Sequence, residues 1–436
     1  MVTVAVVALA LLVVARPRPY LSARAWGGPT EGAAQLSLRV RTSEHYAGAE
    51  APVALSALEV RARAADGRQA RWSGRVGARG FADVLLPFQG GPLRGPVSLS
   101  LATPGVELAL AEGEVELTVE QWRAAARRRG GWLHGSVSGL LSVRVAAERG
   151  VFAVPFRDPL RIAVQRDGAP VSGAAISIEG DSVDVDPGPR ITDAHGELSI
   201  RLAPTEFVTA LGVRATGPDG ASGAWSGTLP VLPGALHATL ERARLVVRSP
   251  IVREVGFFAI VSEDARRLGG TLSFAPDAGG GARASVALPA ALLRGAPLWA
   301  VVSSELDLRS QSAVGWPLHT VGPGGAPPQT FTVPDRLLLD GSAQGAERER
   351  QRRERARLLA GVVSAVGALL VALLVIDRVR TSRERLAEHL NRTSGGQAAA
   401  LAAISGRRSL FWLVVAVLCI ALGFAVVTLI AMYRMG

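Results

Sequence analysis

Four aspartates that lie close together in the sequence are the strongest candidates for chemistry in this chain. They are Asp181, Asp184, Asp186 and Asp193. Clustered carboxylate oxygens are the hard ligands that Ca²⁺ prefers, so a calcium site in this loop is one hypothesis. The spacing does not match an EF-hand loop, and the run 187–189 (Pro-Gly-Pro) restricts how the loop could wrap around an ion. A solvated acidic loop is therefore the favoured interpretation.

The sequence contains no recognisable catalytic motif. It has neither a Gly-x-Ser-x-Gly elbow nor a His-Glu-x-x-His pair, and a lysine-containing phosphate loop is impossible because the chain has no lysine. The six histidines occur singly, and we expect each of them to be a surface or turn residue. They are His45, His134, His195, His237, His319 and His389. We therefore predict that the chain is not an enzyme and uses no cofactor.

The formal net charge of +11 does not by itself indicate a nucleic-acid partner. The exclusive use of arginine, together with abundant alanine and glycine, is typical of genes with a high G+C content. Acidic residues interleave with the arginines along residues 30–340, so no basic stripe forms and we predict no nucleic-acid binding. The single cysteine, Cys419, has no partner for a disulfide or a cysteine-ligated metal.

Alternation of apolar and polar residues predicts many short β-strands. In the segment 35–41, Leu36, Leu38 and Val40 would share one face, which is the pattern of a half-buried strand. Similar runs, separated by Gly, Pro and Asp, follow at the spacing that is typical of β-sandwiches. They are residues 58–64, 97–101, 140–145, 160–164, 174–178, 198–202, 211–215, 245–247, 257–261, 285–288 and 298–302.

One pattern occurs three times: a turn glycine, a short strand and a terminating proline. The copies are residues 80–87, 196–204 and 281–289. Their separation is that of domains and not of solenoid repeats, so we predict three tandem sandwiches, with chance similarity of short strands as the alternative. Between the first two sandwiches, residues 120–129 predict a short connecting helix that ends before Gly130 and Gly131. The alternative interpretation of its basic residues is a surface patch of cations.

The middle copy has the most specific sequence. Residues 168–178 read Gly-Ala-Pro-Val-Ser-Gly-Ala-Ala-Ile-Ser-Ile, and residues 192–196 read Thr-Asp-Ala-His-Gly. Asp193 can accept hydrogen bonds from the amides of its own turn, and Gly196 can take a positive φ. Residues 155–230 resemble the bacterial Ig-like modules of the carboxypeptidase-regulatory-like and macroglobulin-type families, which implies a β-sandwich that serves as a spacer or binding platform. The cysteine-containing thioester motif of macroglobulins is absent, so protease trapping by that chemistry is not implied.

Three apolar segments indicate a membrane protein. Residues 358–376 and 410–433 would form helices of about 28 and 36 Å, against a hydrocarbon core of about 30 Å. Residues 2–15 have the length of a signal-peptide core, which predicts a cleaved targeting segment or an uncleaved anchor; a buried strand is the alternative. We therefore predict a C-terminal transmembrane hairpin.

Small residues four positions apart suggest how these spans pack. They are Gly361, Ser364, Ala365 and Ala368 in the first span, and Ala421 and Ala425 in the second. Such faces let helices approach closely, within the hairpin or with a partner protein. Neither span contains an aspartate, glutamate, arginine or histidine, which disfavours an ion or proton pathway.

The arginines that flank the spans do not decide the topology. Six arginines precede the first span in residues 347–357, and seven lie in the loop of residues 377–408. The signal-like N-terminus and the β-modules favour a large region outside the cytoplasm; a cytoplasmic large region is the alternative.

The predicted fold is mainly β, with tandem Ig-like β-sandwich domains followed by a two-helix transmembrane hairpin. The segments are 1–19 (signal-like or anchor), 20–119 (sandwich 1), 120–154 (connecting helix and strand), 155–240 (Ig-like sandwich 2), 241–333 (sandwich 3), 334–357 (linker and charged helix), 358–376 (span), 377–409 (helical loop) and 410–433 (span). The predicted function is a non-catalytic interaction or scaffold protein of a bacterial cytoplasmic membrane, held in the lipid bilayer and bound to a protein of the membrane or envelope. The alternatives are a binding protein for envelope polysaccharide that uses exposed tryptophan and arginine, and an accessory subunit of a membrane complex.

Overall fold

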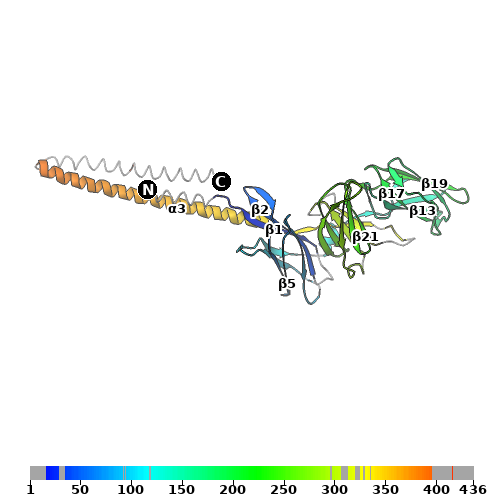
Figure 1. Ribbon diagram of the computed structural model, residues 1–436, viewed down its shortest axis with the longest axis horizontal. Helices are drawn as coiled ribbons and strands as arrows, with labels where there is room; N and C mark the ends of the chain where they lie inside the picture. Colours follow the sequence, from blue (N-terminus) through cyan, green and yellow to red (C-terminus); the bar gives the residue numbers. More distant parts are fainter. Residues whose placement is uncertain are drawn as a thin grey trace. The chain divides into compact units, whose positions relative to one another are not determined.

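Antiparallel β-sheets and one long C-terminal helix make up the computed structural model (Figure 1). The structure describes residues 16–28, 35–91, 93, 95–116, 119–294, 297–305, 313–319, 325–327, 329–333, 335–394 and 415. The chain divides into one unit of residues 22–43 and 51–342 and another of residues 1–21, 44–50 and 343–436. The predicted mainly-β fold is confirmed. The apolar segment 2–15 and, apart from residue 415, the second predicted span lie outside the described residues.

The first pair of sheets, which we call module 1, has the strand orders β3-β2-β1-β30 and β5-β4-β7-β8, with β6 also paired to β2. Alternate residues of facing strands, such as Leu38, Val60 and Leu99, are buried between the two sheets. The strands are β1 (Tyr20–Gly27), β2 (Gln35–Tyr46), β3 (Ala49–Pro52), β4 (Leu58–Ala64), β5 (Gln69–Gly74), β6 (Phe81–Pro87), β7 (Val97–Ala102), β8 (Ala111–Val115) and β30 (Arg336–Asp340).

The strand β30 completes module 1 from far along the chain. It pairs antiparallel with β1, and Trp26 lies opposite Leu337. The sequence predicts residues 334–357 as a linker and charged helix, and for residues 336–340 this prediction is wrong. Three consecutive leucines show no alternation, and the partner strand lies about three hundred residues earlier, so no local pattern marks this strand.

Module 2 is a β-sandwich with the strand orders β11-β13-β17-β16, with β14 on β13, and β10-β19-β18-β15. Its core joins residues from both sheets, including Ile162, Leu202, Val213 and Trp225. The strands are β10 (Gly135–Gly139), β11 (Ser142–Ala147), β13 (Asp158–Arg166), β14 (Ala169–Pro170), β15 (Ala175–Glu179), β16 (Val183–Val185), β17 (Glu197–Pro204), β18 (Ala210–Thr216) and β19 (Ser222–Thr228). The sandwich implied by the family resemblance is therefore confirmed at the level of the fold.

Module 3 is a second complete sandwich, with the strand orders β21-β22-β26-β25 and β24-β23-β27-β28. Phe258, Leu272 and Trp316 are buried in its core. The strands are β21 (His237–Glu241), β22 (Arg244–Ser249), β23 (Val255–Val261), β24 (Arg266–Ser273), β25 (Ala275–Pro276), β26 (Ala282–Ala287), β27 (Trp299–Ser303) and β28 (Val314–Pro317).

Short elements connect the modules. Helix α2 (Val119–Ala125) is followed by β9 (Arg127–Gly130), which pairs antiparallel with β29 (Gln329–Thr332), while β12 (Phe152–Ala153) pairs parallel with β20 (Val231–Leu232). The helix predicted over residues 120–129 is therefore wrong in its second half. The guanidinium of Arg128 lies 5.1 Å from the centre of the Phe331 ring, so a distant aromatic strand overrides the local preference for helix.

Strand β2 is buried on both faces, where the sequence predicts a half-buried strand. Leu36, Leu38 and Val40 face the core of module 1, and on the opposite face Ser37 and Arg39 are also buried. The alternating pattern predicts that the polar face of this strand is exposed. The module that covers this face comes from a distant part of the chain, so the sequence of the strand gives no sign of it.

A buried cluster of charges covers that second face. Nη2 of Arg39 donates hydrogen bonds to the carbonyl oxygens of Phe258 and Gly270, each at 2.8 Å, and Nη1 lies 3.4 Å from Asp335. Nε of Arg266 donates to the other oxygen of Asp335 at 2.9 Å. Burial lowers the pKa of Arg39, and Asp335 is the largest opposing influence. One carboxylate thus joins two arginines from β2 of module 1 and β24 of module 3.

Space for Arg266 depends on a glycine. A Cβ atom on Gly269 would lie 1.8 Å from Nη2 of Arg266. On its other side, Arg266 donates from Nη1 to the Ser37 hydroxyl. Gly269 within strand β24 therefore leaves room for a guanidinium that reaches into module 1.

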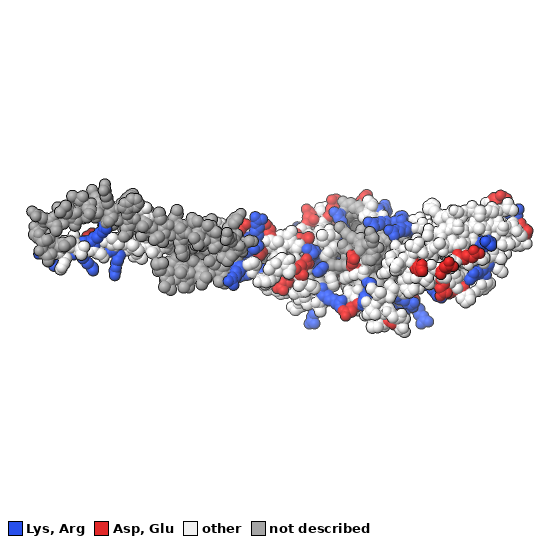
Figure 2. All heavy atoms as spheres, turned by 90° about the horizontal axis from the view of Figure 1, so that it is seen from above, with Lys and Arg blue, Asp and Glu red and all other residues white. Residues whose placement is uncertain are grey.

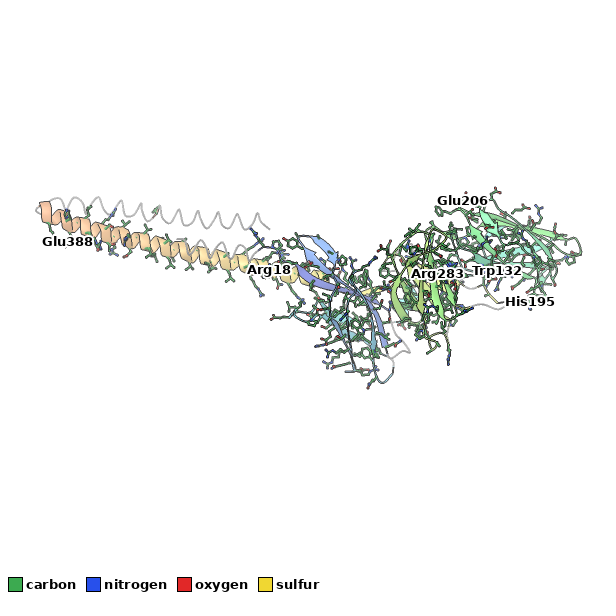
Figure 3. The ribbon with its side chains drawn as sticks, in the orientation of Figure 1. Arg18, Trp132, His195, Glu206, Arg283 and Glu388 are labelled. Carbon is green, nitrogen blue, oxygen red and sulfur yellow. The ribbon has the colours of Figure 1, made fainter. Side chains whose placement is uncertain are left out.

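Helix α3 (Gly341–Ser394) runs without a break through the predicted first span, and its part from Gly341 to His389 is long and apolar enough to cross a membrane. The chain near the N-terminus lies beside it: the Arg18 amide donates to Oε1 of Glu349 at 3.0 Å, and Arg352 donates to the Arg16 carbonyl at 2.8 Å. A hydrogen bond from Arg352 is the main influence that lowers the pKa of Glu349. Figure 3 shows Arg18 near the first part of the helix and Glu388 near its far end.

We expect Asp335→Asn to lower the free energy of unfolding by about 3–5 kcal/mol, because two buried arginines would lose their shared counter-charge. Urea unfolding of the full chain, followed by tryptophan fluorescence, measures the effect. Asp66→Asn, which removes an exposed partner of Arg68, is the matched control and should leave the midpoint unchanged. Equal, small effects of both substitutions would show that the buried cluster does not hold modules 1 and 3 together.

Candidate interaction surface

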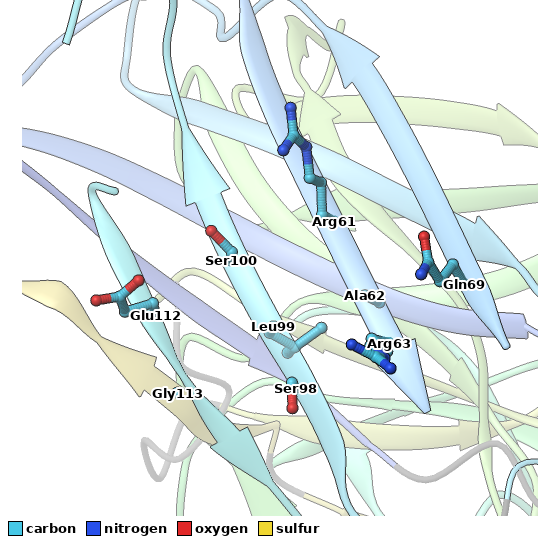
Figure 4. Close-up of a pocket in the computed structure, with 9 residues that line it drawn as sticks. All are labelled: Arg61, Ala62, Arg63, Gln69, Ser98, Leu99, Ser100, Glu112 and Gly113. Carbon is cyan, nitrogen blue, oxygen red and sulfur yellow. The ribbon is translucent and has the colours of Figure 1, made fainter. Parts of the chain in front are cut away.

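The outward face of the sheet β5-β4-β7-β8 in module 1 is a polar surface with opposite charges on its two sides (Figure 4). Alternation within each strand points Val60, Ala62 and Leu99 into the core, and it points their neighbours outward. The register then aligns one row of outward residues across the sheet, Arg71, Arg61, Ser100 and Glu112, and a second row, Gln69, Arg63, Ser98 and Glu114. Basic residues occupy β5 and β4, serines occupy β7, and glutamates occupy β8.

Glu59 neutralises part of the basic side. Its carboxylate lies 2.7 Å from Nε of Arg61 and 2.5 Å from Nε of Arg71. The hydrogen bond from Arg61 is the main cause of the lowered pKa of Glu59. Within the described residues Arg63 forms no ion pair, so it is the cation on this face that is available to a ligand.

A hollow lies over the centre of this face. Arg61, Arg63, Gln69, Ser98, Ser100 and Glu112 line it with hydrogen-bonding groups, and its floor includes Ala62 and Leu99. Guanidinium, amide, hydroxyl and carboxylate groups together suit an extended polar ligand, such as a polysaccharide or a hydrophilic protein segment. The arrangement offers binding groups but no pair of a nucleophile and a base.

Three of the four candidate aspartates take part in ion pairs or in a turn. Arg157 pairs with both Asp184 and Asp186. Oδ1 of Asp193 accepts hydrogen bonds from the amides of His195 and Glu197, each at 2.9 Å, so the predicted capping of this turn is confirmed. Asp181 lies in the turn between β15 and β16, whereas Asp193 lies between β16 and β17. In the part of the chain that the structure describes, no group of three or more potential ligands could hold a metal ion.

The tryptophans do not form an exposed platform. Trp122, Trp225, Trp299 and Trp316 are buried, and Trp132 has the Arg144 guanidinium 4.4 Å from its ring centre. Trp72 is half-buried. The glycan site that the sequence suggests on exposed tryptophans therefore has no such platform among the described residues. Arginines and acidic residues are interspersed over the face shown in Figure 2.

His237 is a buried residue that sequence reasoning missed, because an isolated histidine gives no signal of its environment. The expectation of a surface or turn residue is wrong here: its Nε2 lies 3.0 Å from Asp158 and 3.1 Å from Nη1 of Arg149. Phe156 stacks on its ring with centres 4.9 Å apart, and Trp316 meets it edge-on at 5.0 Å. This cluster joins β13 of module 2 to β21 and β28 of module 3.

Two opposing influences act on the carboxyl group in this cluster. Burial would raise the pKa of Asp158, but Arg149 and His237 together outweigh it and lower the pKa below the ordinary value. Nη1 of Arg149 donates to Asp158 at 3.0 Å. Asp158 is therefore ionised in the folded protein and serves as the common acceptor at this junction.

The small residues that are buried in helix α3 are neighbours of the residues that the sequence predicts for helix packing, and not those residues themselves. Ala360 is fully buried, and Ala356, Gly367 and Ala372 are also buried. Of the predicted set, Ala365 is exposed, while Gly361 and Ala368 are half-buried. No described atom lies within 4 Å of a Cβ placed on Gly361. The structure does not describe the side chain of Ser364, and Ala421 and Ala425 lie outside the described residues.

Comparisons with known proteins assign no family to this chain. No family model and no curated protein matches it. Similar solved structures include domains 1–6 of the surface layer protein SbsC, with 8% identity, a TM-score of 0.20 and coverage of 70% of this chain and 48% of that one, so this chain spans about half its length. The adhesin FdeC of Escherichia coli has 15% identity and a TM-score of 0.18, and the match covers 70% of this chain and 97% of FdeC. The Salmonella alpha-2-macroglobulin has 14% identity and a TM-score of 0.17, and the match covers 70% of this chain and 23% of that protein. At TM-scores this low, none of these likenesses bears on the function.

The lowered pKa of Asp158 predicts a defined pH dependence. Its carboxylate contributes stability at pH values above the ordinary pKa of 3.8, and that contribution is lost as the pH falls below this value through the folded-state pKa. We expect Asp158→Asn to destabilise the protein by about 3–5 kcal/mol near pH 7 and by progressively less below about pH 4. Urea unfolding between pH 3 and 7 measures this, and a difference that does not change with pH would contradict the assignment.

The buried face of α3 makes a separate prediction. Ala360→Leu should lower the melting temperature of the detergent-solubilised chain, because overpacking a buried helix contact costs about 1–3 kcal/mol. Ala365→Leu adds the same atoms at an exposed position and should have no effect. Light scattering during heating compares the two variants, and equal melting temperatures would place the packing face elsewhere on the helix.

Proposed function

We propose that this chain is a membrane-anchored, non-catalytic interaction protein. Its β-modules lie outside the cytoplasm and bind a protein or polymer of a bacterial envelope, and helix α3 crosses the cytoplasmic membrane. The apolar segment 410–433 returns across the same membrane in this proposal. The polar face of module 1 is the proposed contact surface.

The observation that carries the proposal is the direct connection between a β-module and a helix that can span a membrane. Strand β30 ends at Asp340, and α3 begins at Gly341. Oδ1 of Asp340 accepts hydrogen bonds from the Ser342 amide at 2.9 Å and from Nε of Arg24 in β1 at 3.1 Å, so the residue that caps the helix is also bound to the sheet. A Cβ on Gly341 would lie 1.9 Å from the Leu110 carbonyl oxygen. Gly341 and Ser342, the first two residues of α3, therefore lie against module 1, and they follow β30 directly in the sequence.

The distribution of charge along α3 supports a spanning helix with water at both ends. Residues 347–357 form ion pairs along the helix, such as Glu349 with Arg352 and Arg350 with Glu354. The apolar run 358–376 follows, and most of its leucines and valines are exposed. Glu388 and Arg392 then form a further i,i+4 pair. An apolar run of about 28 Å between two charged segments matches a bilayer core of about 30 Å.

The polar face of module 1 supports binding of a hydrophilic partner. Among the residues that the structure describes, it has an arginine without an ion pair, two serines and glutamates around a hollow, and no bulky apolar group is exposed in its centre. Such a surface favours recognition through hydrogen bonds and charge over burial of apolar area. An envelope polysaccharide or a polar segment of an envelope protein has the matching chemistry.

Cysteine labelling in the full chain tests the proposed topology. In a Cys419→Ser background, Ala278→Cys places a thiol on an exposed turn of module 3, and Ser382→Cys places one on α3 beyond the apolar run. We expect a membrane-impermeant maleimide to label the first in intact spheroplasts and the second only after lysis. Labelling of Ser382→Cys alone in intact spheroplasts would invert the topology, and recovery of the chain in the soluble fraction would exclude membrane anchoring.

A further inference from the structure

Strand β10 of module 2 is a sheet edge with no protection. It is the end strand in the order β10-β19-β18-β15, and all five of its residues are exposed. Its sequence is Gly-Ser-Val-Ser-Gly, without charge or proline. Val137 is 52% exposed, and Leu140, just beyond the strand, is 71% exposed.

The other end strands of the six large sheets are protected against pairing with another chain. Within the described residues, each of them carries a charged residue or a proline, the two devices that natural edge strands use most. They are β3, β30, β5, β8, β11, β16, β15, β21, β25, β24 and β28. Strand β10 is the exception, so its open edge requires an explanation.

The register shows which backbone groups of β10 are unused. The Leu140 amide donates to the Ser222 carbonyl at 2.8 Å, so Leu140 and, by alternation, Ser138 and Ser136 direct their backbone groups toward β19. The amide and carbonyl of Val137 therefore point away from the sheet. Among the described residues, these two backbone groups of Val137 have no hydrogen-bond partner.

The glycines at the two ends of β10 are required by its close contact with β19. A Cβ on Gly135 would lie 2.4 Å from Nε1 of Trp225, and one on Gly139 would lie 2.4 Å from the Ser222 carbonyl oxygen. Both ends of the open edge are consequently free of side chains. An approaching strand meets only two serines and one valine.

We propose that the occupant of this edge is β10 of a second copy of the chain. Gly135–Gly139 reads the same in both directions, so antiparallel pairing about a two-fold axis at Val137 places Val137 opposite itself and each Ser136 opposite Ser138 of the other copy. Two-fold contacts are self-complementary in this way: residue i meets j, and j meets i. Val137 directs its free amide and carbonyl outward, so the central pair exchanges two hydrogen bonds. The two four-stranded sheets would then form one continuous eight-stranded sheet.

Pairing of five residues buries less surface than the roughly 800 Å² per partner of a stable soluble interface, so the contact is weak for molecules in solution. Confinement of both copies to one membrane raises their effective concentration and favours pairing. This step rests on the membrane anchoring proposed above, and the experiment therefore measures anchoring and pairing separately.

A charge exchange at Val137 tests the two-fold pairing. Two copies of the full chain with different tags are co-expressed, the intact membranes are cross-linked with formaldehyde before solubilisation, and co-purification of one copy with the other is then measured. When both copies carry Val137→Lys, or both carry Val137→Glu, like charges oppose each other on the axis, and we expect co-purification to fall at least about fivefold. When one copy carries Val137→Lys and the other Val137→Glu, co-purification should return to at least the parental level.

Val208→Lys is the matched control. Val208 is an apolar residue of the same module, 78% exposed and outside β10, and this substitution should leave co-purification unchanged. Equal melting temperatures of all variants check that module 2 remains folded, and flotation with membrane vesicles checks anchoring. Floating chains that do not co-purify, or a Lys–Glu combination no better than the Lys–Lys one, would overturn the pairing and leave the membrane anchor intact. Chains that fail to float would overturn the anchor instead.

Discussion

The Asp335 carboxylate, shared by Arg39 and Arg266, is the interaction on which the arrangement of this chain depends. The three residues come from strand β2, from β24 and from the segment just before β30, and all three are almost fully buried. Removal of three charges from water is costly and is offset only where every charge has partners with good geometry. Arg39 meets part of this condition through Asp335 and the carbonyls of Phe258 and Gly270. Module 1 and module 3 therefore meet through specific ion pairs and hydrogen bonds, beside the edge-on contact of the Phe81 and Phe257 rings, whose centres lie 5.2 Å apart.

The cluster also explains how module 1 tolerates a long insertion. Modules 2 and 3 lie between β8 and β30, so the sheet of β1 and β30 closes only after more than two hundred residues have folded elsewhere. Closing so long a loop has an entropic cost that grows slowly with its length. Strand β9, which precedes modules 2 and 3, pairs with β29, which follows them. This pairing holds the two ends of the insertion close together and so reduces the entropic cost of pairing β30 with β1. Asp335 then lies directly before β30, where the ion pairs hold the returning strand in position.

The parts of the fold that the sequence predicts are those with local causes. Residues 160–164, 211–215 and 257–261 alternate or form short apolar runs between turn residues, and each lies in a strand of the structure. The failures concern residues whose state depends on distant partners. Arg39 has the pattern of an exposed residue, β30 has no alternation, and Arg127–Arg129 follow a good helix sequence but pair with β29.

The same limit applies to the candidate surface. Arg61 and Arg63 alternate with core residues, and this alternation predicts that they face outward. Their alignment with Ser100 and Glu112 depends on the pairing of β4, β7 and β8, which strand patterns do not specify. The separation of this face into a basic side and an acidic side therefore follows from the register of the paired strands. Composition, which shows arginines and acids interleaved along the chain, gives no indication of it.

The exclusive use of arginine has a structural consequence at the module junctions. Arg39 contacts two carbonyl oxygens and a carboxylate, and its guanidinium carbon lies 5.0 Å from the centre of the Phe257 ring. Arg149 similarly joins Asp158, the Ala238 carbonyl and the Trp316 ring. A planar guanidinium can donate along several directions in its plane and stack through its face, whereas an ammonium is a compact, strongly hydrated charge. Arginine therefore suits these two junctions better than lysine would, because a guanidinium tolerates burial against carbonyl groups and aromatic rings.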